Sequence, residues 1–182
     1  QEDLLEQTEK DYWEKKSDPG DALFEDAEQE RSAGIESDGG GILNASKKFK
    51  KQIFLVLNPD TIWRKGYKKE FRKLEKVYLK NKKPTMLLVS KNKSYDRSFK
   101  GDFNLNSKNQ ILRQKNNKFI FTGAQIIDRS VFKKRKVKPF SMNKVWDDLI
   151  SNKELLGVTS RQKFFHINSY KIYKKLNKKI ID

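Results

Sequence analysis

The feature that most constrains the fold is a strand-like apolar run, an amphipathic helix and a second apolar run in direct succession. The two runs are IFLVL at residues 53–57 and TMLLVS at residues 85–90. Short apolar runs with β-branched members are typical of fully buried strands. Between them, apolar side chains recur at helical spacing over residues 65–81. A connection of this length predicts a right-handed crossover, and therefore a parallel α/β sheet.

The rest of the chain adds further elements to this unit. Residues 95–127 contain short apolar stretches separated by Gly, Asn and Lys, which predicts antiparallel strands beside the parallel core. Residues 141–152 begin with a capping Ser and carry one apolar face, which predicts a helix. Two further strands are predicted at residues 155–160 and 163–169, and an amphipathic helix over residues 170–181.

Charge is distributed very unevenly along the chain. Residues 1–38 hold 14 acidic and 4 basic residues, a balance of 4 − 14 = −10, whereas residues 39–182 hold 10 acidic and 37 basic residues, a balance of 37 − 10 = +27. We therefore predict an acidic, poorly packed helical arm over residues 1–37 and one α/β domain over residues 38–182. The basic domain is suited to nucleic acid or to the phosphates of a small substrate. Its Lys-rich composition alone is an equally open explanation.

Composition excludes several classes of site. The chain has no Cys, so disulfides and Cys-based zinc sites are excluded. No apolar run approaches the roughly 18 to 20 residues of a membrane span. The acidic start does not fit a signal peptide, which needs a basic start and an apolar middle. We therefore expect a cytoplasmic protein without a membrane partner.

Asp60 is the strongest candidate for a metal ligand. It follows the first predicted strand, and open α/β sheets bind their ligands at the carboxyl ends of strands. Asn58 precedes it by two residues, with Pro59 between them. A carboxylate at this position suits a hard cation such as Mg²⁺, which needs few protein ligands. A turn-capping role for Asp60 is the competing interpretation.

Two other features indicate a binding site, but less specifically than Asp60 does. Gly39, Gly40 and Gly41 precede a predicted helix, where glycines let backbone N–H groups approach a phosphate, although such a run also serves as a hinge. His166 is the only histidine and follows an apolar pair, so a hydrogen-bonded, partly buried histidine is the simpler interpretation.

The order of six segments resembles that of the sugar-phosphate nucleotidyltransferases. The resemblance is closest to the N-acetylmuramate-1-phosphate uridylyltransferase and mannose-1-phosphate guanylyltransferase-like branch, and it covers about residues 38–180. It implies a Rossmann-like (GT-A-like) mixed sheet flanked by helices, incomplete at the amino-terminal end. In chain order the segments are GGGILNASKKF, FLVLNPDTIW, FKGDFNL, FIFTGAQIIDRSVF, SMNKVWDDLI and FFHINS.

The resemblance also implies the reaction and the site. The reaction is transfer of a nucleotidyl group from a nucleoside triphosphate to a sugar 1-phosphate, with release of pyrophosphate and with Mg²⁺, or Mn²⁺ as the alternative, as cofactor. Asp60 and His166 fall at the positions of the metal ligands. By the same resemblance, the nucleotide would be contacted by Gly39, Gly40, Gly41 and Asn58. The sugar phosphate would be contacted by Gly101, Asp102, Thr122 and Gly123.

The chain also departs from the pattern of this family. It contains no G-x-G-T-R-x₃-P-K phosphate loop, Pro59 replaces a Gly, and Asp38 stands where the glycine loop has a Thr. His166 replaces the second metal-binding Asp, and imidazole suits Mn²⁺ or Zn²⁺ better than Mg²⁺; a hydrogen bond to phosphate, or loss of the role, are the other outcomes. We therefore expect a fragment with reduced or no activity. The alternative is a basic nucleic-acid- or partner-binding module with an acidic regulatory arm.

Overall fold

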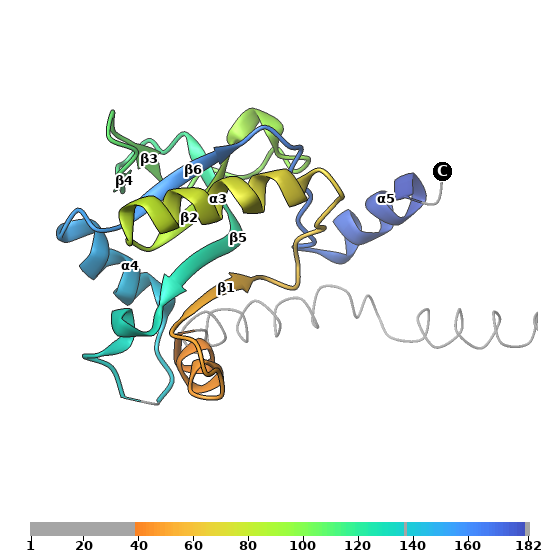
Figure 1. Ribbon diagram of the computed structural model, residues 1–182. Coiled ribbons are helices and arrows are strands. Elements are labelled where there is room, and N and C mark those ends of the chain that lie inside the picture. The colour runs from red at the N-terminus through yellow and green to blue at the C-terminus, as the bar shows by residue number, and fades with distance from the viewer. Residues whose placement is uncertain (1–38, 137, 181–182) are drawn as a thin grey trace, which may run out of the picture.

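The structure, a computed structural model, describes residues 39–136 and 138–180, and the predicted acidic arm over residues 1–37 lies outside these ranges. Its centre is a four-stranded sheet with the order β1-β5-β2-β6 (Figure 1). β1 (Ile53–Leu57) and β2 (Thr85–Ser90) both run antiparallel to β5 (Phe119–Asp128), while β6 (Leu156–Ser160) is parallel to β2. The predicted mixed α/β sheet is confirmed.

The position of β5 differs from the sequence-based expectation. β1 and β2 run in the same direction, as the strand–helix–strand unit predicts, but β5 lies between them instead of beside them. Only the short β3 (Asn104–Leu105) and β4 (Ile111–Leu112) form a separate antiparallel pair. The local sequence pattern indicates which segments are extended. Which strands lie next to each other depends on the long-range pairing of backbone groups.

β1 is a half-exposed edge strand, so the prediction of a fully buried strand is wrong. Ile53 and Leu55 are each 42 % exposed and Leu57 is 40 % exposed, while Phe54 and Val56 pack into the core on the other face. β1 pairs with β5 on one side only, and α3 packs against β2, β5 and β6. One face of β1 therefore has no helix over it within the described part of the chain.

Helices lie on both faces of the sheet. α3 (Tyr67–Asn81) buries Tyr67, Leu74 and Tyr78 against one face, where they meet alternate residues of the strands such as Leu87. The helix ends at Lys82, which has a left-handed backbone conformation and whose N–H donates to the Tyr78 carbonyl. The opposite face, which carries Met86 and Leu88, is covered by α4 (Met142–Ser151) and by a helix over residues 39–46 (Figure 1, orange).

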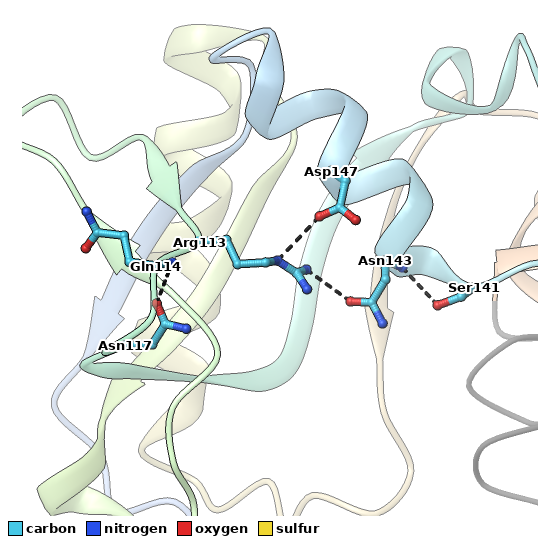
Figure 2. Close-up of polar contacts among 6 residues, drawn as sticks. All are labelled: Arg113, Gln114, Asn117, Ser141, Asn143 and Asp147. Carbon is cyan, nitrogen blue, oxygen red and sulfur yellow. Dashed lines mark hydrogen bonds and ion pairs between the residues drawn. The ribbon is translucent and has the colours of Figure 1, made fainter.

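Arg113 joins the segment after β4 to α4. Figure 2 shows its guanidinium reaching two side chains of this helix, with Nε 3.4 Å from Asp147 Oδ1 and Nη2 donating to Asn143 Oδ1 at 3.1 Å. The same helix begins with Ser141, whose Oγ accepts a hydrogen bond from the Asn143 N–H at 3.1 Å. The predicted helix and its Ser cap are confirmed.

Three short or terminal elements complete the chain. These are the 3₁₀ turns η1 (Lys91–Lys93) and η2 (Arg129–Phe132) and the final helix α5 (Tyr170–Ile180), which extends away from the sheet (Figure 1). The strand predicted over residues 163–169 is absent from the described structure. Phe164 and His166 instead form isolated β-bridges with Ser94 and Thr61, respectively. Because these two partners belong to different loops, the segment does not run alongside any one strand.

Candidate functional site

Two hydrogen bonds fix the turn after β1 to the middle of β5, and a third closes the turn itself. The Asn58 N–H donates to the Gly123 carbonyl at 2.9 Å, and the Thr61 hydroxyl donates to the Thr122 carbonyl at 2.9 Å. The Trp63 indole N–H closes the turn on the Asn58 carbonyl at 3.2 Å. The structure thus places Asn58 and Asp60 beside Thr122 and Gly123, which are about sixty residues away in the chain.

Gly123 occupies a position that requires glycine. Its φ is +85°, and a Cβ added there would lie 2.6 Å from the Asn58 Cβ. The pairing of β2 with β5 also shifts its register opposite this point, between Met86 and Leu88. Thr122 and Gly123 are both buried, and the Thr122 hydroxyl donates to the Leu87 carbonyl at 2.9 Å. Their proximity to the Asp60 turn is therefore a packing arrangement in this structure.

Asp60 and His166 lie together at the carboxyl end of β1. His166 Nε2 is 3.0 Å from Asp60 Oδ2, with the side chains 15 % and 35 % exposed respectively. The backbone reinforces the pair, since Thr61 bridges His166 and the Ile167 N–H donates to the Asp60 carbonyl at 2.8 Å. The sequence places these two residues more than a hundred positions apart, and only the fold brings them into contact.

Two aromatic rings hold the His166 imidazole in place. Phe99 meets it edge-on with ring centres 5.6 Å apart, and Phe164 stacks at 5.8 Å. The buried Nδ1 atom of His166 has no hydrogen-bond partner among the described residues. The two rings therefore fix the orientation of the imidazole, with Nε2 facing Asp60.

Two more carboxylates surround this pair. Burial raises the pKa of Asp102, although the backbone N–H of Phe121 and the positive charges of Arg113 and His166 oppose the increase. Burial also acts to raise the pKa of Asp96, but hydrogen bonds from Ser98 and Asn168 outweigh it, and the pKa lies below the usual value for Asp.

The sequence-based analysis missed part of this group. Asn168 Nδ2 donates to Asp96 Oδ2 at 2.7 Å, and Phe99 packs on His166. Asp96 and Asn168 are ordinary polar residues of loop segments, so no local pattern marked them. The influence of His166 on the pKa of both Asp96 and Asp102 could be found only from their distance in space.

The predicted Gly101 and Asp102 pair lies against β5. Gly101 has a φ of +92°, and a Cβ there would lie 2.6 Å from the Asn117 carbonyl oxygen. The Asp102 N–H donates to the Phe119 carbonyl at 2.7 Å, and its Oδ2 accepts from the Phe121 N–H at 2.8 Å. Asp102 is therefore anchored one residue before Thr122, on the strand that also holds the Asp60 turn.

The three glycines predicted at the nucleotide lie in the helix over residues 39–46, and two of them pack against a different part of the fold. The Gly39 N–H donates to the Phe140 carbonyl at 2.9 Å, and a Cβ at Gly40 would lie 2.5 Å from the Lys138 carbonyl oxygen. A Cβ at Gly41 would meet no atom within 4 Å. Close packing of the helix on residues 138–140 accounts for Gly39 and Gly40, and their predicted nucleotide contact stays a prediction.

The Asp60 and His166 pair can supply two of the ligands of a divalent cation. Adjacent ligands of an octahedral ion with bonds of about 2.1 Å lie about 3.0 Å apart, which matches the separation of Asp60 Oδ2 and His166 Nε2. Within residues 39–136 and 138–180, no group of three or more His, Cys, Asp and Glu side chains is placed to hold a metal. Any such ion would need further ligands from water or substrate.

Comparison with solved structures identifies the fold. The chain is similar to HddC from Yersinia pseudotuberculosis, with 19 % identity, a TM-score of 0.57, and coverage of 80 % of this chain and 63 % of that one. It is similar to a UDP-glucose pyrophosphorylase at 10 % identity and a TM-score of 0.60, covering 80 % and 60 %. It is also similar to the inositol-1-phosphate CTP transferase from T. maritima at 11 % and 0.53, covering 79 % and 62 %.

These matches bear on the fold only, because the identities are low. They confirm the expected nucleotidyltransferase-like architecture, and the chain spans about three fifths of the length of the structures it matches. No protein-family model and no curated protein sequence matches the chain. In the described part of the chain, every helix is too short or too polar to cross a membrane.

Proposed function

We propose that this chain is part of a sugar-1-phosphate nucleotidyltransferase, with Asp60 and His166 at its metal site. One observation carries the proposal: the two side chains predicted as metal ligands lie 3.0 Å apart at the carboxyl end of β1. That position, in a fold shared with a UDP-glucose pyrophosphorylase and an inositol-1-phosphate CTP transferase, is where open α/β sheets bind ligands.

The proposed reaction forms one P–O bond and breaks another. An oxygen of the sugar 1-phosphate attacks the α-phosphorus of a nucleoside triphosphate, and pyrophosphate leaves. Such transfers depend mainly on positioning and on neutralising phosphate charge. Mg²⁺ or Mn²⁺, when bound, would supply part of that neutralisation. The chain's own contribution is a preorganised pair, because Phe99 and Phe164 orient His166, and the backbone of Ile167 holds Asp60.

The other predicted contacts belong to the same proposal. Gly101, Asp102, Thr122 and Gly123 would border the sugar phosphate, and Asn58 would contact the nucleotide. Because the Thr122 hydroxyl is occupied by the Leu87 carbonyl, we assign Thr122 the task of shaping the site without contacting the ligand directly.

Binding of Mn²⁺, followed by its electron paramagnetic resonance signal, tests the metal site without requiring turnover. We expect the 182-residue chain to bind the ion and Asp60→Asn to bind it about 10-fold or more weakly, since removing a metal-site group typically costs that much. His166→Asn should weaken binding as well. The matched control is Glu154→Gln, an exposed carboxylate in the turn before β6. Equal affinity in Asp60→Asn and the wild type would sink the proposal.

Turnover is a separate question from metal binding. The 182 residues contain no G-x-G-T-R-x₃-P-K segment to hold the triphosphate, so we expect this chain to release little pyrophosphate from a nucleoside triphosphate and a sugar 1-phosphate. Robust turnover by the purified chain would contradict the expectation of reduced activity, while leaving the metal site intact.

Net charge supports one competing function, a nucleic-acid-binding module. Residues 39–182 carry a balance of 37 − 10 = +27, which favours polyanions. Steeply salt-dependent affinity for RNA or DNA, unaffected by Asp60→Asn and by metal, would favour that module. Metal-dependent protection by a nucleoside triphosphate that is lost in Asp60→Asn would favour the transferase.

A further inference from the structure

A hollow lies beside the segment that carries His166, on the side away from Asp60. Consecutive side chains of an extended backbone point to opposite sides, and Phe165, next to His166, lines a hollow of about 650 Å³. The bridge between Thr61 and His166 and the hydrogen bond from the Ile62 N–H to the Phe165 carbonyl separate the two places. The hollow is therefore distinct from the Asp60 site, and its volume falls in the usual range for small-molecule pockets.

The polar lining of this hollow is entirely suited to an anion. Four basic side chains line it and no acidic one does; they are Arg64, Lys93, Arg97 and Lys163. None of the four forms an ion pair with the described residues. Arg97 is anchored by donating to the Asn92 carbonyl at 3.0 Å, and the Arg64 guanidinium lies 5.5 Å from the centre of the Phe165 ring. A phosphate group is the natural partner for such a set.

A buried hydroxyl in the same lining lacks a partner. Ser94 is only 3 % exposed, it lines the hollow, and its Oγ makes no hydrogen bond within the described structure. A buried polar atom without a partner costs free energy. Because this hydroxyl lines the same hollow as four basic side chains, an oxygen of a bound anion is a suitable partner for its missing hydrogen bond.

The remaining wall is aromatic. Tyr95 and Phe165 lie with ring centres 5.6 Å apart and planes tilted by 32°, and both line the hollow together with the buried Leu176 of α5. A flat apolar wall next to a cluster of cations matches a molecule with a planar base and a phosphate.

We propose that this hollow binds a nucleotide, with its phosphate among the four basic side chains and the Ser94 hydroxyl, and its base against Tyr95 and Phe165. The nucleotide is either free or one unit of a single-stranded nucleic acid, because both present the same phosphate and base. This site is independent of the proposed transferase reaction and needs no metal.

Calorimetric titration of the 182-residue chain in EDTA tests the site. The probes are adenosine 5′-monophosphate, adenosine, inorganic phosphate and a short oligouridylate. We expect the monophosphate to bind more tightly than adenosine or phosphate alone. The double variant Lys93→Gln with Lys163→Gln should weaken that binding about 10-fold or more. The matched control is Lys108→Gln with Lys144→Gln, two exposed lysines elsewhere, which should bind like the wild type. Asp60→Asn should also bind like the wild type.

Ser94→Ala separates a ligand contact from a structural role. The variant should bind the monophosphate several-fold more weakly, yet its unfolding midpoint should be equal to or above that of the wild type, since it removes an unpartnered hydroxyl. If oligouridylate binds at least tenfold more tightly than the monophosphate, and its affinity falls steeply with salt, the result supports single-stranded nucleic acid as the ligand. Equal affinities would support the free nucleotide. Equal loss in the control double variant, loss in Asp60→Asn, or a destabilised Ser94→Ala would overturn the proposal.

Discussion

Replacing Gly123 with Ala probes how the fold holds the Asp60 turn. At a φ of +85° an alanine pays for a left-handed backbone with about 1–2 kcal/mol. The added Cβ would lie 2.6 Å from the Asn58 Cβ, and relieving an overlap of this kind in a packed region costs about 1–3 kcal/mol. We therefore expect Gly123→Ala to lower the free energy of unfolding by about 2–5 kcal/mol.

Urea denaturation followed by the fluorescence of Trp63 and Trp146 measures this change. Gly41→Ala is the matched control, because the same methyl group there meets no atom within 4 Å and lies in the helix over residues 39–46. It should leave stability unchanged or raise it by up to about 1 kcal/mol. If Gly123→Ala stays within about 0.5 kcal/mol of the wild type, or if both variants lose the same amount, the proposed contact with Asn58 is wrong.

Three further predictions concern a buried carboxylate, the core under α3 and the cap of α4. Asp102→Asn should be at least as stable as the wild type at neutral pH, because burial raises the pKa of Asp102 in the folded state; its advantage should grow as pH rises from about the ordinary value of 3.8 through the folded pKa, as urea titrations at several pH values would reveal. Leu74→Ala, which empties a fully buried position under α3, should cost about 2–5 kcal/mol by the same assay. Ser141→Ala should cost about 1 kcal/mol, since it removes the cap on the Asn143 N–H, and thermal unfolding by circular dichroism would detect it.

Local patterns predicted the helices better than the strand neighbours. α3 appears where apolar spacing places it, and α4 where apolar spacing and the capping Ser141 place it. Apolar spacing and helix capping involve residues only a few positions apart, so both can be recognised in the sequence. The partners of β1 could not be read in this way, because an apolar run looks the same at the edge of a sheet and in its centre.

The candidate site divides in the same manner. Asp60 was predicted from its place after a strand, and the resemblance to nucleotidyltransferases paired it with His166; the contact itself exists only in the fold. Asp96 and Asn168 gave no local signal, since they reach the His166 region from separate loops. The nucleotide contact of Gly39, Gly40 and Gly41 stays a prediction, while the structure gives Gly39 and Gly40 a packing reason.

By itself the sequence determined the kind of protein this is: an α/β domain with a basic surface, and a carboxylate at the end of its first strand, because periodicity, charge and strand-end position are local properties. The tertiary structure alone decided that β5 lies between β1 and β2, that Gly123 packs against Asn58, and that a cationic hollow lies next to the segment that carries His166. These depend on which distant segments meet, and that is fixed only when the backbone pairs and the core packs.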